Sequence, residues 1–473
     1  MSVSLRLDRL DAAFTFLISG SADAIGPAAL PASSASDDLS TVRRFSFSGV
    51  ASGIAKWPSP GANLYGPILL LDSGEHLPEI SYGRERRHVE ECGAMASRGP
   101  ILSRRNLIKG MGAAALAPIP RTFAQATVKP WWLGNGMPQE SASTPKIACA
   151  IDLHSGVTDE AIRSVVQLGV YHVLSGGPPI PWSVSQLQPI VEELKAGDVT
   201  LGNLMIGGFP NTIYGRPGRD QEIEKVRQSV EAAGVVGIPV VEYNFYAHRA
   251  MEGYYEETGR GGAGLTAVDY DRMKDLRPLP DEGAHTLEEM WANITYFLKA
   301  VVPVAEKANV RLALHPNDPP FPLSRGSQQI MATFDGWKHL IEIVDSPANG
   351  ITFDCGVTRE LGEDPVEVCR YFGSRDRINH VHYRNPHVMK PYVKYDEGFV
   401  DEGDVNMFAV IRELLRLKYA RELYPEHPRA LDYDRARGPI HGYPGGGGYA
   451  GDVYDIAYAK AMLQAALVVE QSR

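Results

Sequence analysis

Cysteine is scarce in this sequence, and the few that occur are scattered. Cys92, Cys149, Cys355 and Cys369 stand far apart, and no Cys-x-x-Cys pair occurs. A disulfide framework and a zinc knuckle are therefore not expected, because both need cysteines in closely spaced sets. The sequence also lacks an apolar run of the roughly 20 residues that cross a bilayer as a helix. We therefore predict no membrane contact for the mature protein.

An excess of positive charge is missing as well. The chain has 47 Lys and Arg against 57 Asp and Glu, which gives a formal net charge of −10 at pH 7. Such a balance repels phosphate backbones, so nucleic acid is not an expected partner. With 473 residues, 44% of them hydrophobic, the chain is long enough for one large soluble domain with extensions. Composition does not decide between a monomer and a homo-oligomer.

The first 94 residues show no pattern of a folded domain. They are rich in Ser, Ala, Gly, Asp and Arg, and they lack a sustained period of 2 or 3.6. We predict that residues 1–94 are a disordered extension, or that translation starts at Met95 and this stretch is not made.

Residues 95–126 have the order of an export signal. Arg104 and Arg105 precede a short stretch of small and apolar residues, and Ala124-Gln125-Ala126 has the form of a cleavage site. The paired arginines resemble a twin-arginine signal. If the segment at 104–126 is used, the protein is exported or periplasmic and begins near Thr127; otherwise it is cytoplasmic. The alternative is that two arginines open an ordinary amphipathic helix.

From Lys146 to the end, short apolar runs alternate with longer amphipathic stretches. Strands that alternate with helices pair in parallel, and eight such units predict a closed (β/α)₈ barrel, the TIM barrel, over residues 146–473. A doubly wound open sheet is the competing architecture, but the first strand lacks its Gly-rich phosphate turn. The predicted strands are Ile147–Leu153, Tyr171–Ser175, Leu201–Ile206, Val240–Tyr246, Arg311–His315, Ile351–Asp354, Ile378–Tyr383 and Glu422–Glu426.

Helices are readable between several of these strands, and two connections are long. Thr286-x-x-Glu289 has the form of a capping box. The long connections, Ala247–His285 and Asn385–Gly403, follow predicted strands and are candidate substrate lids, because such loops crown the active-site face of a barrel. The predicted helices are Asp159–Leu168, Glu222–Ala233, Thr286–Ala308, Asp335–Val344, Val405–Leu417 and Asp452–Glu470.

Residues of the types that bind metals stand at or near the ends of the last four predicted strands. They are His315, Asp354, His382 and Glu426, the last followed by His427. Strand ends on one rim of a barrel bring distant side chains together, and imidazoles with carboxylates suit Mn²⁺, Fe²⁺, Zn²⁺ or Mg²⁺. A single histidine at a strand end is more often only hydrogen-bonded to a carbonyl. Four in equivalent places predict one divalent-metal site.

These residues carry a resemblance to a known family. His315-Pro316-Asn317-Asp318-Pro319-Pro320 resembles the His-Pro-Asp-Asp-Pro-Pro signature of the mannonate dehydratases. The match covers roughly the C-terminal two-thirds of the mature chain. Its further pieces are Tyr243-Asn244-Phe245, Arg325, 348–353, Val381-His382-Tyr383-Arg384, 402–407, Pro425-Glu426-His427 and Gly448-Tyr449.

The resemblance implies roles for these positions. It makes His315, Asp354, His382 and Glu426 the metal ligands, with Mn²⁺ the expected ion. It implies that Tyr449 and His427 act in acid-base chemistry, and it points to Asn244, Arg325 and Arg384 as substrate-binding residues. It also implies dehydration of a sugar acid, D-mannonate to 2-keto-3-deoxy-D-gluconate or a close analogue.

The chain departs from the family pattern at three places. The family usually has Cys where this chain has Asp354, so an alignment shifted by one place would make Cys355 the ligand instead. The family usually has Asp where this chain has Glu426. The family's Asp-Trp-Thr-Arg stretch is replaced here by residues 246–250. In this stretch, His248 is a candidate acid or base, and Arg249 is a candidate to bind the carboxylate of the substrate. Both are equally compatible with a surface position.

Two other functions remain open at this point. The same barrel serves metal-dependent sugar isomerases and epimerases, which also move a proton beside a carbonyl. A sugar-binding protein that lost the chemistry is the non-enzymatic alternative, although such a protein has little use for four converging ligands.

Overall fold

The structure, a computed structural model, describes residues 138–154, 156–437 and 442–471. The predicted extension at 1–94 and the predicted signal at 95–126 lie outside these residues and stay predictions, which N-terminal sequencing of the natively expressed protein would test. Among the described helices, none is long and apolar enough to cross a membrane.

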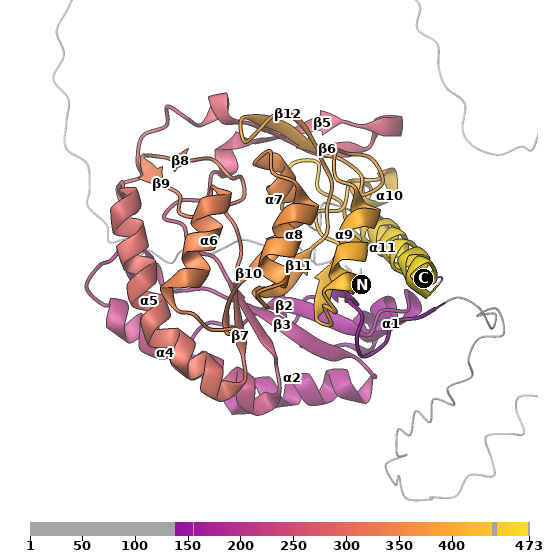
Figure 1. The fold of residues 1–473 in the computed structure, drawn as a ribbon, viewed down its shortest axis with the longest axis horizontal. Helices are drawn as coiled ribbons and strands as arrows, with labels where there is room; N and C mark the ends of the chain where they lie inside the picture. The colour runs from indigo at the N-terminus through magenta and orange to yellow at the C-terminus, as the bar shows by residue number, and fades with distance from the viewer. Residues whose placement is uncertain (1–137, 155, 438–441, 472–473) are drawn as a thin grey trace, which may run out of the picture. The chain divides into compact units, whose positions relative to one another are not determined.

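Eight parallel strands close into a barrel in the order β1-β14-β11-β10-β7-β4-β3-β2, with helices around them (Figure 1). The predicted (β/α)₈ barrel is thus confirmed. The strands are β1 (Lys146–Ala150), β2 (His172–Gly176), β3 (Thr200–Ile206), β4 (Val240–Tyr243), β7 (Arg311–Leu314), β10 (Asn349–Asp354), β11 (Ile378–His382) and β14 (Glu422–Tyr424). The helices that follow them in turn are α1 (Asp159–Gln167), α2 (Val184–Ala196), α4 (Arg219–Val236), α5 (Leu287–Ala308), α6 (Phe334–Ile343), α8 (Pro365–Gly373), α9 (Met407–Arg416) and α11 (Tyr449–Gln471).

The predicted elements are found, with differences at their ends. The strands β4 and β14 stop earlier than predicted, because their last residues leave the ladder and enter the loops of the barrel mouth. The helix α5 begins with the predicted capping box between Thr286 and Glu289. Two barrel helices, α2 and α8, were not predicted from the sequence. The helix α2 contains Pro189, and α8 has 9 residues.

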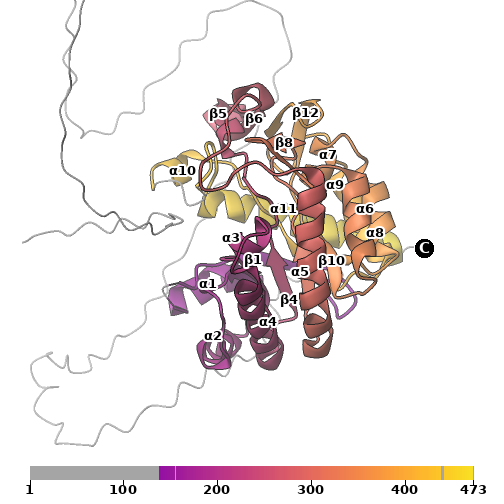
Figure 2. The same ribbon diagram turned by 90° about the vertical axis from the view of Figure 1, so that its left-hand side faces the viewer.

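The two long connections do not form separate lids. They pair with each other as a four-stranded sheet in the order β12-β13-β6-β5, which we call the cap sheet. It consists of β5 (Tyr254–Thr258) and β6 (Gly264–Asp269) from the first connection, and β12 (Pro386–Lys390) and β13 (Lys394–Glu397) from the second. Both views place β5, β6 and β12 at one end of the barrel (Figure 1 and Figure 2).

The cap sheet has a small core of its own. Tyr254, Val268 and Tyr395 from the sheet pack with Phe321, which lies in the loop after β7. Burial of aromatic rings on this scale stabilises the arrangement by several kcal/mol, about 1.5–3 per large side chain. The cap sheet is therefore a fixed part of the barrel mouth, built from segments that follow β4 and β11.

Polar side chains occupy part of the barrel interior. Glu242 of β4 accepts hydrogen bonds from Asn203 of β3 and from Thr352 of β10. The strands β4 and β10 are not neighbours in the sheet, so a contact between them must cross the inside of the barrel. His380 of β11 and Glu422 of β14 are also fully or nearly fully buried. Barrel interiors are more often filled by branched apolar residues, so this polar layer needs a functional explanation.

Candidate metal centre

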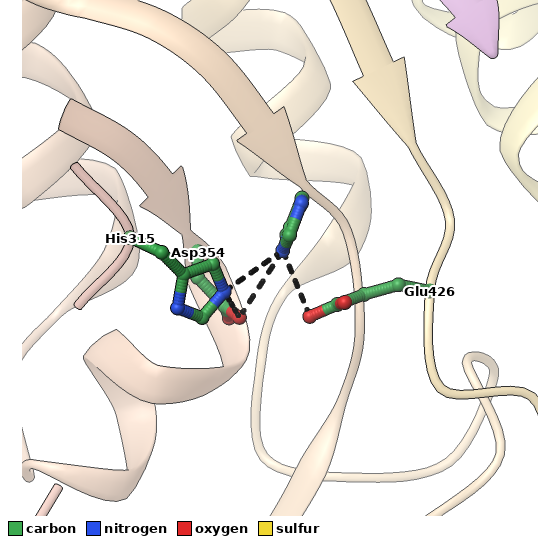
Figure 3. A group of neighbouring side chains, drawn as sticks. His315, Asp354 and Glu426 are labelled. Atoms are coloured by element: carbon green, nitrogen blue, oxygen red, sulfur yellow. Dashed lines mark hydrogen bonds and ion pairs between the residues drawn. The ribbon is translucent and has the colours of Figure 1, made fainter. Parts of the chain in front are cut away.

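The four predicted metal ligands lie together at the mouth of the barrel. They come from four strands that are consecutive in the sheet, β7, β10, β11 and β14. His315 follows β7, Asp354 and His382 end β10 and β11, and Glu426 follows β14 by two residues. Figure 3 shows His315, Asp354 and Glu426 pointing toward one another. One nitrogen or oxygen atom from each of the four lies within 4.8 Å of the others.

The distances within this group fit a single ion. His315 Nε2 and His382 Nδ1 are 3.0 Å apart, and His382 Nδ1 is also 3.0 Å from Glu426 Oε1. Asp354 Oδ2 lies 3.8 Å from His315 Nε2 and 3.9 Å from His382 Nδ1. Two donors bound at right angles, each about 2.1 Å from one ion, are about 3.0 Å apart. The donor set of two imidazoles and two carboxylates can therefore hold a divalent cation.

The tautomer of His315 suits a ligand. Its Nδ1 lies 2.7 Å from the carbonyl oxygen of Pro316. A carbonyl only accepts, so Nδ1 carries the proton and the lone pair of Nε2 faces the other three ligands. Burial, with His382 next to it, lowers the pKa of His315 to about 4, which keeps the ring neutral.

Asp354, and not Cys355, belongs to the group. Asp354 Oδ1 accepts from the backbone N–H of Val357 and caps the short helix α7 (Cys355–Glu360), while Oδ2 faces His315. The thiol of Cys355 is directed to the carbonyl oxygen of Arg384 instead, at 3.4 Å, and burial raises its pKa. Successive side chains at the end of a strand point to opposite sides, which accounts for the choice.

The pKa values of His382 and Asp354 favour bound protons when no ion is present. Burial alone would lower the pKa of His382, but Glu426 and Glu242 outweigh it and raise the pKa to about 9. Burial raises the pKa of Asp354 to about 7, against the opposing charge of Arg384. Protonated ligands cannot bind metal, so a cation must displace these protons.

Arg384 lies behind the ligands, surrounded by acids. Its Nε donates to Asp354 Oδ2 at 2.9 Å and to Glu426 Oε1 at 3.1 Å. Its Nη1 donates to Glu360 at 2.5 Å and to Glu397 at 3.3 Å. The guanidinium is buried, and it holds both carboxylates among the four ligands in place. Its predicted contact with substrate is a separate matter and stays a prediction.

His427 lies beside the ligands, on the side of the cap sheet. Its Nδ1 is 2.8 Å from Glu397 Oε2, and its Nε2 is 3.7 Å from Glu426 Oε2. Burial works against charge on His427, but Glu397 and Glu426 overcome it and raise the pKa of the ring. Its φ of 51° is uncommon for a residue other than glycine, and such backbone strain gathers at functional sites. The ring also packs against Tyr443, with centroids 4.8 Å apart.

Arg249 reaches the same region from the connection after β4. Its Nη1 donates to the hydroxyl of Tyr443 at 2.9 Å, and its Nε donates to the carbonyl oxygen of Asp318 at 3.1 Å. Tyr254 of the cap sheet donates to Asp318 Oδ1 at 3.0 Å. The Nη2 of Arg249 lies 3.6 Å from Asp318 Oδ2, and 29% of the side-chain surface of Arg249 is exposed, so a positive group paired with one acid reaches the barrel mouth.

The remaining predicted residues lie elsewhere at the mouth. His248 lies between Glu252 and Glu282, at 3.0 and 2.6 Å, and Arg325 binds the same Glu252 at 2.5 Å. Both therefore belong to one polar network that joins the first long connection to the loop after β7. Among the contacts recorded for the described residues, none joins this network to the four ligands.

Asn244 and Tyr449 also have contacts outside the group. The amide of Asn244 lies 3.9 Å from the sulfur of Met205. Tyr449 begins α11, is exposed, and directs its hydroxyl to the carbonyl oxygen of Ser164 at 3.5 Å. The tyrosine that packs against His427 is Tyr443, six residues earlier. The catalytic role of Tyr449 and the substrate contact of Asn244 stay predictions.

Comparison with known proteins identifies the family of the chain. The sequence model of the family described as D-mannonate dehydratase (UxuA) matches residues 260–473. A mannonate dehydratase of Streptococcus equi subsp. zooepidemicus is 30% identical over 331 residues, which are 61% of this chain and 87% of that protein. The chain belongs to the mannonate dehydratase family. All four ligand positions fall within the range that the family model matches.

Two further relatives support the assignment and the fold. A mannonate dehydratase of Thermotoga petrophila is 28% identical over 325 residues, which are 60% of this chain and 89% of that protein. The crystal structure of mannonate dehydratase from Streptococcus suis serotype 2 covers 69% of this chain and 96% of its own, with 24% identity and a TM-score of 0.62. This last likeness shows that the two share a fold.

Several functional residues were missed from the sequence. Asp318 stands within the signature without a predicted role, and Glu397 lies in a connection predicted only as a candidate lid. Glu242 and His380 stand inside strands, each directly before a segment that the resemblance covers. Tyr443 precedes the Gly-rich stretch, whereas the predicted catalytic tyrosine, Tyr449, follows it. A search for acids and histidines inside strands, rather than only at their ends, would have found Glu242 and His380.

The titration of the group predicts how metal affinity depends on pH. His382, with a pKa of about 9, and Asp354, with a pKa of about 7, hold protons that the ion must displace. We expect the apparent affinity for Mn²⁺ to rise between pH 6 and pH 9, with protons released on binding. Isothermal titration in buffers of different ionisation enthalpy measures both quantities. Affinity that does not change over this pH range would contradict the assignment of these ligands.

Proposed function

We propose that this protein dehydrates a sugar acid, D-mannonate or a close analogue, with one divalent cation held by His315, Asp354, His382 and Glu426. The observation that carries the proposal is the convergence of these four ligands at the barrel mouth, in a chain of the mannonate dehydratase family. A positive group at the rim, Arg249, suits a substrate that carries a carboxylate.

The reaction removes the elements of water from neighbouring carbons. The C2–H bond beside the carboxylate breaks and its proton goes to a base. The hydroxyl on C3 leaves with a proton as water, and the resulting enol becomes the 2-keto-3-deoxy acid. A base and an acid are therefore needed, together with stabilisation of the negative charge that develops on oxygen.

A bound divalent cation supplies that stabilisation as a Lewis acid. The set of two neutral imidazoles and two carboxylates is a mixed one, and we propose Mn²⁺ as the ion because hard oxygen donors favour it alongside nitrogen. Arg384 keeps the two carboxylates oriented through its Nε–H, so the ligand atoms are in place before substrate arrives.

His427 is the residue best placed to move a proton. Its Nδ1 is held by Glu397, an acid whose pKa is lowered to about 2 because the charges of His427 and Arg384 outweigh its burial. The opposite nitrogen, Nε2, faces the side of Glu426 and the barrel mouth. A ring oriented on one nitrogen by a carboxylate can exchange a proton at the other.

Tyr443 is the second candidate for a proton carrier. Its ring packs against His427, and its hydroxyl oxygen accepts a hydrogen bond from Arg249. A positive donor on the phenol oxygen favours the ionised form, against the burial that raises the pKa of this tyrosine. Arg249 thus orients Tyr443 and presents charge to the same space.

An assay with purified protein and Mn²⁺ tests the proposal. We offer D-mannonate, other sugar acids and a panel of ketoses, and we follow formation of a 2-keto-3-deoxy acid. Dehydration of a sugar acid, lost after chelation and restored by metal, is the expected result. Interconversion of ketoses and aldoses instead would identify a sugar isomerase, and sugar binding without metal or product would identify a binding protein.

The substitution His427→Asn tests the proton carrier. We expect kcat to fall by about 10²- to 10⁴-fold, the usual contribution of a general acid or base. Metal content should be unchanged, because His427 is not one of the four ligands. The matched control is His387→Asn, since His387 pairs with Asp396 on the cap sheet and is 42% exposed. Equal activity of the two variants would rule out His427.

The pair Tyr443→Phe and Tyr449→Phe separates the two tyrosines. Both changes remove only a hydroxyl, and the structure brings Tyr443 against His427 but leaves Tyr449 exposed. We expect Tyr443→Phe to slow turnover by about 10²-fold and Tyr449→Phe to leave it unchanged. Steady-state kinetics on the sugar acid measures both. The reverse order would support the role that the resemblance to the family implies for Tyr449.

A further inference from the structure

The metal centre has a polar layer directly beneath it, inside the barrel. His382 has two ring nitrogens that face different groups. Its Nδ1 points to the other ligands, 3.0 Å from both His315 Nε2 and Glu426 Oε1. Its Nε2 faces into the barrel, where the nearest charged atom is Oε1 of Glu242, at 3.4 Å. Among the described residues this nitrogen makes no hydrogen bond, so the charge of Glu242 is its one recorded polar contact.

Glu242 is held firmly in this position. Thr352 donates to its Oε1 at 2.7 Å, and Asn203 donates to its Oε2 at 2.8 Å. The side chain is fully buried, and the two bonds come from strands on either side of β4 in the strand order of the barrel. A buried carboxylate without a cation beside it is costly, so its position next to His382 calls for a reason.

We propose that Glu242 is a positioning residue for the metal centre, which orients His382 so that Nδ1 binds the ion. When Nε2 carries a proton and faces Glu242, the lone pair of Nδ1 must face His315, Asp354 and Glu426. Carboxylates of this kind fix the tautomer and the orientation of ligand histidines and strengthen them as donors. The inference rests on the proposed metal-dependent function and extends the site by one layer into the barrel.

The structure disfavours a second cation in this layer. Glu242, His380 and His382 lie close enough to hold one. However, both oxygens of Glu242 already accept hydrogen bonds, and a second ion would need His382 to lose both ring protons. His380 instead packs edge-on against His382, with ring centroids 5.0 Å apart, and supports it from the side.

The substitution Glu242→Gln tests the proposal in the full chain. It keeps the shape of the side chain and removes the charge that faces Nε2 of His382. We expect the apparent dissociation constant for Mn²⁺ or Co²⁺ to increase about 10- to 100-fold. In the Co²⁺ form, the visible spectrum and the paramagnetically shifted N–H resonance of the ligand imidazole should also change. Thr352→Val, which keeps the charge but frees Oε1, should give a smaller loss of affinity.

The matched control is Glu422→Gln. Glu422 is also buried in the barrel interior, and burial, with Glu242 nearby, raises its pKa well above its ordinary value, which favours the uncharged form. This variant should bind metal as the wild type does, with the same Co²⁺ spectrum.

Three results would overturn the proposal. If Glu242→Gln binds one equivalent of metal as tightly as the wild type, with an unchanged spectrum, only the positioning role fails and the metal centre stands. If the wild type binds two equivalents and Glu242→Gln one, the layer is itself a cation site. If the wild type binds no divalent ion, the proposed function fails as well. Should Glu242→Gln not fold, the comparison of Thr352→Val with Glu422→Gln decides in the same way.

Discussion

Buried carboxylates require positive charge beside them, and this requirement shapes the mouth of the barrel. Asp354, Glu426, Glu360 and Glu397 all surround Arg384, away from bulk water. Arg384 alone does not balance four acids where the effective dielectric constant is low, and Glu397 pairs in addition with Arg429 and His427, as Glu426 does with His382. Protons on Asp354 and Glu360, whose pKa values are raised mainly by burial, offset part of the negative charge. A divalent cation held by the four ligands would replace the proton on Asp354 and supply positive charge in its place, so the electrostatics favour the ion that the proposed chemistry uses.

The order of the strands in the barrel, and not closeness in the sequence, brings the ligand side chains together. Four consecutive strands deliver the ligands, because the carboxyl ends of parallel strands meet at one rim. The cap sheet then adds Glu397 at the end of β13, which holds His427. Its pairing of segments after β4 and β11 places Tyr254 and Glu397 on one fixed surface above the ligands, where loose lids would leave them unplaced.

The site is organised in depth. Glu242 lies in the interior, the four ligands lie above it, and His427 with Tyr443 lies toward the mouth. His382 links the first two levels through its two nitrogens, and Glu426 links the second to the third through its two oxygens. Positioning and proton transfer are thereby assigned to different residues, which allows each to be removed separately by substitution.

Local pattern determined much of this protein. The alternation of strands and helices indicated a closed barrel, and a ligand-type residue at or near each of four strand ends indicated a metal at the rim, because strand ends in such a barrel share one place. The choice of Asp354 over Cys355 needed the observed turn into α7, which settles which of two successive side chains faces the ligands. Tyr443 and Tyr449 are six residues apart with similar surroundings in the sequence, yet only one meets His427, because the path of the chain into α11 decides it. The positioning role proposed for Glu242 rests on its contacts with residues of other strands. Side chains so distant in the sequence become neighbours through tertiary structure alone.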